Sequence, residues 1–171
     1  SPELLGGEAQ QAKFEALVEQ LEDLEGQQCI VWVHFRRTGQ WIAEQLDEMY
    51  DISTRLINGD TTAAERQQIR QDFAEGKFRV LVMNLSTGKY GLSFPNVPMI
   101  YVERTFDRDA FVQSMYRSRR LTTTESPLVV VLEAILDDGK PTIDRVVGQG
   151  LEENLELTTE LLRGHLESAG R

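Results

Sequence analysis

The amino-acid sequence predicts an α/β protein in which a mainly parallel sheet lies between two layers of helices. Short runs of β-branched and aromatic residues alternate along the chain with amphipathic segments long enough to form helices. The strongest of these runs are apolar throughout, as is typical of strands buried on both faces. No internal repeat recurs at a fixed period. This alternation indicates βαβ units and hence a three-layer α/β/α sandwich.

The first elements are a helix, a strand, a second helix and a second strand. Apolar residues recur at spacings of three and four through residues 10–24, which predicts an amphipathic helix that ends at Gly26. The run Cys29–Phe35 is β-branched and aromatic, which predicts a buried strand. Residues 41–49 repeat apolar side chains at helical spacing, and Ser53–Ile57 predicts a short strand.

The next unit begins with a turn and a helix cap. Residues 58–60 read Asn-Gly-Asp, which is a turn signal. Thr62 stands three residues before Glu65, the spacing of a capping box, and predicts a helix that continues to about Gly76. Phe78–Met83 then predicts another buried strand.

The rest of the chain repeats this pattern. Strands are predicted at Met99–Val102 and Leu128–Leu132, and helices at Ala110–Arg119 and from Ile143 to about Leu166. Because the carboxyl ends of parallel strands meet at one edge of a sheet, we expect the loops that follow them to converge there. Open α/β sheets bind their ligands at this edge.

Composition and charge limit the classes of function. The chain has 171 residues, enough for one domain with a substantial core, and no long apolar stretch, so no membrane partner is expected. Its 18 basic and 28 acidic residues give a net charge of −10, which disfavours tight independent binding to a polyanion. Basic residues nevertheless gather in 104–120, which holds five arginines against two aspartates. The single cysteine, Cys29, lies in an apolar run and is expected to be a buried, reduced thiol.

The segment Asn84–Phe94 directly follows a buried strand and is rich in hydroxyl groups and glycine. Its hydroxyls and the glycines Gly88 and Gly91 would let backbone N–H groups approach an anion closely, which favours a phosphate contact. A plain strand-to-helix turn is the alternative. The segment is not a Walker A loop, because it lacks the Gly-Lys-Ser/Thr ending and the four-residue gap between glycines.

Gln113, Arg117 and Arg120 are separated by four and three positions, which places them on one face of a predicted helix. Guanidinium groups in this arrangement can grip a triphosphate and neutralise the charge that develops in phosphoryl transfer. An exposed basic helix face is the alternative interpretation.

Two further loops are candidates to face an anion. Residues 58–62 precede a helix N-terminus, where free N–H groups and the helix dipole favour negative charge, although an ordinary capped helix start has the same pattern. His34, Arg36 and Arg37 follow the first strand and could also face a phosphate. The only other histidine in the sequence, His165, is distant, so no metal site is expected.

Taken in order, these segments resemble the C-terminal half of a superfamily 2 helicase-like ATPase, and most of all the SWI/SNF-type DNA translocases. The resemblance spans roughly residues 10–165 and implies a RecA-like lobe at 10–150. An ordered set of motifs carries it: motif IV at 29–46, a turn and arginine-led helix at 55–73, motif V at 82–94, an acidic residue before a polar loop at 101–109, and motif VI at 113–120.

This resemblance implies a shared nucleotide site. Arg117 and Arg120 would be arginine fingers that reach the γ-phosphate of ATP, and Gln113 would help to form the site between two lobes. Gly88 and Gly91 would lie near the nucleotide. ATP and Mg²⁺ would be bound mainly by an N-terminal RecA-like lobe of the same protein, because this sequence holds neither the Walker A lysine nor the acidic pair that binds the metal.

It also implies contacts with the phosphates of a nucleic acid, expected to be duplex DNA. Such contacts carry no base information, so binding would tolerate any sequence. They are expected from three loops: Ser86, Thr87, Lys89, Gly59, Asp60, Thr61, His34 and Arg36. Lys89, Tyr116 and Arg119 depart from the family pattern, which has glycine, glycine and histidine there. These departures indicate a divergent branch, for example a bacterial or viral one.

The remaining expectations concern the two ends of the chain and two alternative functions. Residues 1–9 are expected to be a disordered leader or a remnant of excision from a longer protein, and 151–171 a C-terminal helix that could brace the other lobe. The alternatives are the C-terminal lobe of an RNA helicase of the DEAD-box kind, and a non-catalytic module that docks a protein partner through its acidic surface. We expect an intracellular protein, cytoplasmic if bacterial or viral and nuclear if eukaryotic.

Overall fold

The computed structural model describes residues 6–90, 93–115, 128–135, 142 and 144–150. In this part of the chain, five parallel strands form one sheet in the order β2-β3-β1-β4-β5. They are β1 (Cys29–Val33), β2 (Thr54–Ile57), β3 (Val80–Asn84), β4 (Met99–Tyr101) and β5 (Val129–Val131). The predicted parallel sheet is confirmed. Each strand lies within the run that predicted it, except that β3 extends one residue beyond its run.

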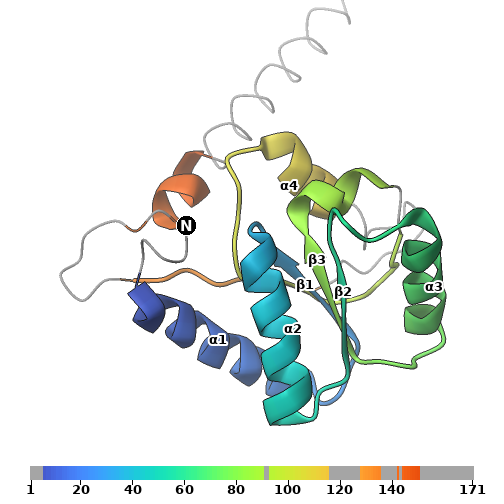
Figure 1. The fold of residues 1–171 in the computed structure, drawn as a ribbon. Coiled ribbons are helices and arrows are strands. Elements are labelled where there is room, and N and C mark those ends of the chain that lie inside the picture. Colours follow the sequence, from blue (N-terminus) through green and yellow to red (C-terminus); the bar gives the residue numbers. More distant parts are fainter. Residues whose placement is uncertain (1–5, 91–92, 116–127, 136–141, 143, 151–171) are drawn as a thin grey trace, which may run out of the picture.

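Helices cover both faces of the sheet (Figure 1). On one face, α1 (Gly6–Asp23) and α2 (Arg36–Tyr50) share an apolar core with the strands. On the other face lie α3 (Ala63–Ala74), the 3₁₀ helix η2 (Leu85–Tyr90) and α4 (Arg108–Met115). The expected three-layer α/β/α sandwich is therefore present.

The side chains of β1 explain why its sequence is apolar throughout. Cys29, Val31 and Val33 belong to the core under α1 and α2, whereas Ile30 and Trp32 belong to the core on the opposite face. All five side chains are fully buried. Because a central strand of a covered parallel sheet has no face toward water, alternation of apolar and polar residues is absent from it.

Local sequence signals set the ends of the helices. The predicted capping box forms at the start of α3: the Thr62 N–H donates to Glu65 Oε2 at 2.7 Å, and the Glu65 N–H donates to Thr62 Oγ1 at 3.3 Å. The prediction is less accurate at the start of the first helix. α1 begins at Gly6, inside the stretch assigned to a leader, because the Glu-Ala-Gln-Gln sequence of residues 8–11 favours helix.

The last described segment is tied to α1. Residues 144–150 are helical, as the pattern after Ile143 predicts. The Asp144 carboxylate pairs with Lys13 at 2.5 Å, and both side chains are only 12% exposed. Val147 packs into the core that contains α4. The expected brace at 151–171 lies outside the described residues.

Candidate functional site

The carboxyl ends of β1 and β3 lie side by side where the chain changes direction across the sheet. After β1 the chain enters α2 on one face, and after β3 it enters η2 on the other. Ligands of open α/β sheets bind at such a switch point. The two loops expected to contact phosphate, at 34–37 and after Asn84, therefore meet at the position that the fold favours.

Asn84, the last residue of β3, joins these two loops. Its side chain is buried, and its Nδ2 donates to the carbonyl of His34 at 2.7 Å. Its Oδ1 accepts from the backbone N–H of Ser86 at 3.1 Å and from the Ser86 hydroxyl at 2.6 Å. Ser86 is itself exposed. The amide of Asn84 thus orients the Ser86 hydroxyl toward itself and holds the backbone at His34, whose side chain is exposed.

Thr87 is placed differently from its neighbour. Its side chain is 1% exposed and its hydroxyl donates to the Asn84 carbonyl at 2.5 Å, so this hydroxyl faces the core. A phosphate contact here would use the backbone N–H. Gly88 and Lys89 lie in the 3₁₀ helix η2 rather than in an open loop, because the hydrogen bonds to Asn84 close the turn. Gly91 lies outside the described residues.

The turn after β2 is built from hydrogen bonds between side chains and backbone. Asn58 Oδ1 accepts the N–H of Asp60 at 2.9 Å, and the Asn58 N–H donates to the Thr61 hydroxyl at 3.0 Å. The capping box of Thr62 follows directly and satisfies N–H groups at the start of α3. The predicted contact residue Thr61 therefore holds the turn together, and its side chain is partly buried.

Arg36 reaches from α2 to this turn. Its Nη1 lies 3.0 and 2.9 Å from the two carboxylate oxygens of Asp60, and its guanidinium lies against Gly59. The two charged side chains are 56% and 74% exposed, so water and salt weaken the pair. A phosphate can compete with a carboxylate for such a guanidinium. The structure thus brings together three predicted contact residues, Arg36, Gly59 and Asp60. The Asp60 carboxylate would compete with a phosphate for the Arg36 guanidinium.

Glu103 supports the first loop of the site from behind, and the sequence interpretation did not name it. It follows β4, and its Oε2 accepts the backbone N–H groups of His34 and Phe35, both at 2.9 Å. Its Oε1 accepts the Thr38 hydroxyl at 2.9 Å. Phe35, at the N-cap of α2, provides no side-chain cap, so Glu103 satisfies these donors from the segment that follows β4. The acidic residue before the polar loop at 101–109 was the signal that could have identified it.

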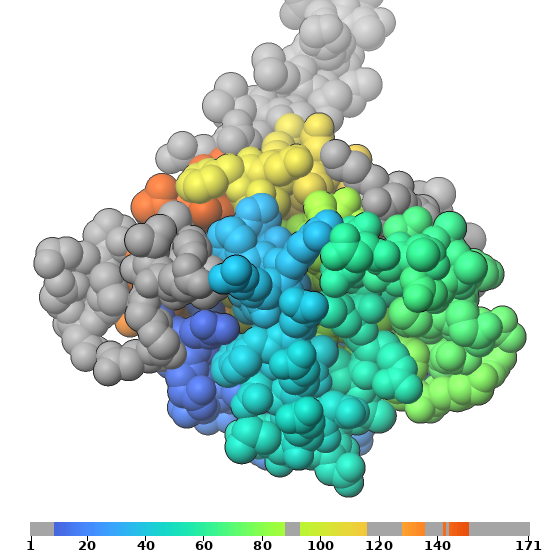
Figure 2. All heavy atoms as spheres, viewed as in Figure 1, coloured from blue at the N-terminus to red at the C-terminus, as the bar shows by residue number. Residues whose placement is uncertain are grey.

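The segment that contains Glu103 also positions α4. In Figure 2 the β4–α4 segment (yellow) lies directly over the start of α2 (blue). Asp107 Oδ1 accepts the N–H of Ala110 at 3.0 Å, which caps α4. In the core, the hydroxyls of Tyr101 and Ser114 are hydrogen bonded at 2.7 Å. α4 is therefore fixed both at its start and on the sheet.

Of the predicted nucleotide residues, the described structure places Gln113 and Gly88. Gln113 is exposed on α4, one residue before the buried Ser114. Arg117 and Arg120 lie outside the described residues, so their arrangement with Gln113 stays a prediction.

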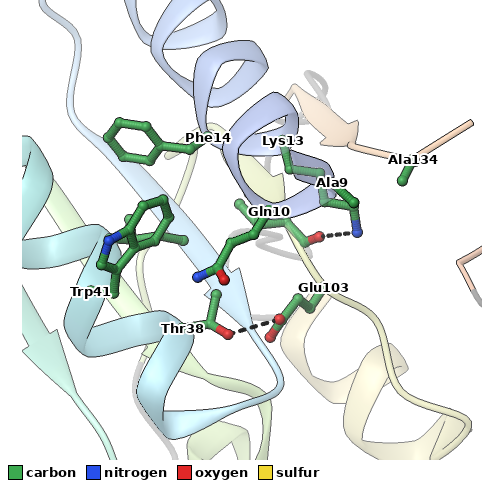
Figure 3. Close-up of a pocket in the computed structure, with 10 residues that line it drawn as sticks. Ala9, Gln10, Lys13, Phe14, Thr38, Trp41, Glu103 and Ala134 are labelled. Atoms are coloured by element: carbon green, nitrogen blue, oxygen red, sulfur yellow. Dashed lines mark hydrogen bonds between the residues drawn. The ribbon is translucent and has the colours of Figure 1, made fainter. Parts of the chain in front are cut away.

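A small cavity lies behind Glu103, between α1 and α2 (Figure 3). Phe14 and Trp41 form its apolar wall, with ring centroids 4.9 Å apart, and the Thr38–Glu103 hydrogen bond lies at its polar end. Its volume of about 40 Å³ is far below the several hundred Å³ of a typical ligand pocket. This cavity has room for water-sized groups and is too small for a nucleotide.

Within the described ranges, no group of three His, Cys, Asp or Glu side chains is arranged to hold a metal ion. No helix in those same ranges is both long and apolar enough to cross a membrane.

Sequence comparison relates the chain to a family model and to a curated protein. The model of the helicase conserved C-terminal domain matches residues 12–122. The ATP-dependent RNA helicase FAL1 of Kluyveromyces lactis is 31% identical over 75 residues, which are 44% of this chain and 19% of that helicase. The chain thus spans about a fifth of this curated relative.

Solved structures show the same architecture. The C-terminal part of the Fun30 ATPase domain matches with a TM-score of 0.67 and 20% identity, over 80% of this chain and 44% of that one. The C-terminal domain of the DEAD-box protein Dbp5 matches with a TM-score of 0.68 and 15% identity, over 84% and 78%. At these identities the likeness establishes the RecA-like fold alone.

Proposed function

Because this chain belongs to the family of helicase conserved C-terminal domains, we propose that it is the second motor lobe of a nucleic-acid-dependent ATPase. In this role it shares ATP and a nucleic acid with an N-terminal RecA-like lobe of the same protein. It contributes phosphate contacts through the loops after β1, β2 and β3, and arginine fingers through Arg117 and Arg120.

The observation that carries the proposal is the junction at Asn84. One buried amide holds the His34 carbonyl and the Ser86 hydroxyl at the switch point of the sheet. Arg36 lies in the first turn of the adjoining helix. The exposed side chains of His34 and Arg36 beside this sheet edge suit a phosphate backbone, because the contacts need position but no base recognition. The partly exposed Arg36 supplies positive charge on a chain whose net charge is −10.

The nucleotide site in this proposal is completed by the other lobe. ATP and Mg²⁺ are bound mainly there, since the Walker A lysine and the metal-binding acidic pair have no counterpart in this sequence. Gln113, Gly88 and Gly91 face the nucleotide from this side, and Arg117 and Arg120 stabilise the charge that develops on the γ-phosphate during hydrolysis.

Duplex DNA is the nucleic acid that we propose, on the motif pattern of the SWI/SNF-type translocases. An RNA substrate is the second candidate, because the similarity to an RNA helicase is 31% over 75 residues. Phosphate contacts alone do not distinguish DNA from RNA. Discrimination between them must therefore come from the sugars and from the geometry of the strands.

The proposal is tested on the intact protein that contains this lobe. ATP hydrolysis is measured without nucleic acid and with duplex DNA, single-stranded DNA and duplex RNA of equal length. We expect duplex DNA to stimulate hydrolysis about tenfold or more, and the isolated lobe to show no hydrolysis. Stimulation by RNA alone would favour the RNA helicase. Absence of ATP hydrolysis by the intact protein would support a non-catalytic docking module instead.

A further inference from the structure

Glu103 connects the start of α2 with the segment that leads into α4. The proposed function assigns the first to nucleic-acid binding and the second to the nucleotide site. Its carboxylate binds the start of α2 through the backbone N–H groups of His34 and Phe35. It also binds Thr38, whose side chain is 3% exposed, within the first turn of the same helix. Glu103 itself belongs to the segment that runs from β4 into α4. All three bonds therefore cross between segments that are 65 to 69 residues apart in sequence.

Each side of this connection is held by further hydrogen bonds. On the α2 side, Asn84 holds the carbonyl of His34, so the turn is fixed by hydrogen bonds to its donor and its acceptor groups. On the α4 side, Asp107 caps the helix four positions after Glu103. The Tyr101–Ser114 hydrogen bond then fixes that helix to β4. The carboxylate is therefore a direct hydrogen-bonded path from the start of α2 to the segment that leads into α4.

We propose that Glu103 is a positioning residue that couples nucleic-acid binding at the start of α2 to ATP hydrolysis at α4. This inference rests on the proposed function. A phosphate at His34 or Arg36 shifts or stiffens the first turn of α2, and Glu103 transfers that change to the helix that carries Gln113. Such a role predicts a loss of coupling without a loss of either binding or basal hydrolysis.

The test uses the intact two-lobe protein with Glu103→Gln and Glu103→Ala. ATP hydrolysis is measured without nucleic acid and at saturating duplex DNA, and the Kd for DNA is measured separately. We expect the stimulated rate to fall about 5- to 150-fold in Glu103→Ala, the range of coupling between two sites. Basal hydrolysis and the Kd should stay within about threefold of wild type, which is below the low end of that range. Duplex RNA is run in parallel, so that the conclusion does not depend on the type of nucleic acid.

Two controls separate positioning from general damage. Thr38→Val removes one of the three bonds to the carboxylate and should lower stimulation, whereas Thr38→Ser keeps the hydroxyl and should restore it. If Glu103→Ala does not fold, this pair carries the test. Asp72→Asn removes an acid on α3 that pairs with Lys77 far from the connection, and should leave stimulation unchanged.

Three results would overturn the inference. Full stimulation in Glu103→Ala would show that the carboxylate transmits nothing. A parallel loss of DNA affinity and stimulation would show that Glu103 only shapes the binding loop. If the wild-type protein hydrolyses ATP but no nucleic acid stimulates it, there is no coupling to transmit. Absence of ATP hydrolysis in the wild type contradicts the proposed function itself and is thereby distinguishable from the first two results.

Discussion

The hydroxyls of Tyr101 and Ser114 lie 2.7 Å apart in the core, between β4 and α4. The hydroxyl of Ser114 also lies 2.6 Å from the carbonyl of Phe111, to which it donates. Because its single hydrogen is used there, Tyr101 must donate to Ser114. Burial raises the pKa of Tyr101, which keeps that donor protonated. One directed chain of hydrogen bonds therefore sets how α4 lies on the sheet.

Removing the Tyr101 hydroxyl and removing the Ser114 hydroxyl should destabilise the chain to different extents. Tyr101→Phe deletes the donor, and the Ser114 hydroxyl keeps its bond to Phe111, so we expect a loss of about 1 kcal/mol. Ser114→Ala leaves the buried Tyr101 hydroxyl without its partner, so we expect a larger loss, about 1–3 kcal/mol. Urea unfolding measures both. A smaller loss in Ser114→Ala than in Tyr101→Phe would contradict the proposed direction of donation.

The cap at Thr62 and the contacts of Glu103 illustrate what the sequence can and cannot predict. The strands and the cap at Thr62 are encoded by neighbouring residues, so the runs and spacings found them. The three bonds of Glu103 join residues 65 to 69 positions apart, and no local pattern encodes such a distance. The 3₁₀ helix after β3 was missed for a related reason. Its hydroxyls looked available for a ligand, but Asn84 uses them to close the turn.

Cys29 should make the chain less stable at alkaline pH. Burial raises the pKa of its thiol from the ordinary value of 9.0 to about 12. Because the folded pKa is the higher one, the stabilisation is complete below pH 9.0 and is lost as the pH rises toward 12. We expect the free energy of unfolding to decline across that interval, and more steeply in wild type than in Cys29→Ala. Equal slopes in urea unfolding at pH 8, 9 and 10 would contradict this cause.

The capping box at the start of α3 should contribute measurably to stability. Thr62→Ala removes the acceptor for the Glu65 N–H and should cost about 1 kcal/mol, whereas Thr62→Ser keeps the hydroxyl and should cost much less. The backbone hydrogen bond from Thr62 lowers the pKa of Glu65. That contribution is present above the ordinary pKa of glutamate and is lost as the pH falls through the lowered value. Thermal unfolding of the two variants at neutral pH provides the measurement, and equal stabilities would exclude the cap.

The pair of Arg36 and Asp60 should regulate nucleic-acid affinity in opposite directions. Asp60→Asn removes a negative charge and releases the guanidinium, so we expect tighter DNA binding. Arg36→Ala should weaken binding for all sequences alike and reduce the salt dependence of log K by about one phosphate contact. Binding of the intact protein is measured at several salt concentrations. An unchanged salt slope in Arg36→Ala would exclude a direct phosphate contact, and Arg70→Ala on α3 serves as a charge-matched control.

The sharpest prediction concerns Arg117 and Arg120, which the motif spacing assigns to the γ-phosphate. In the intact protein, Arg117→Ala or Arg120→Ala should remove about 3 kcal/mol or more of transition-state stabilisation, which is about two orders of magnitude in kcat. Arg119→Ala is the matched control, because it deletes the same charge between them and has no assigned contact. Nucleic-acid affinity should be retained in all three variants. Wild-type turnover in Arg117→Ala or Arg120→Ala would exclude that arginine as a finger, whereas an equal loss in Arg119→Ala would show that net charge, and not position, controls the rate.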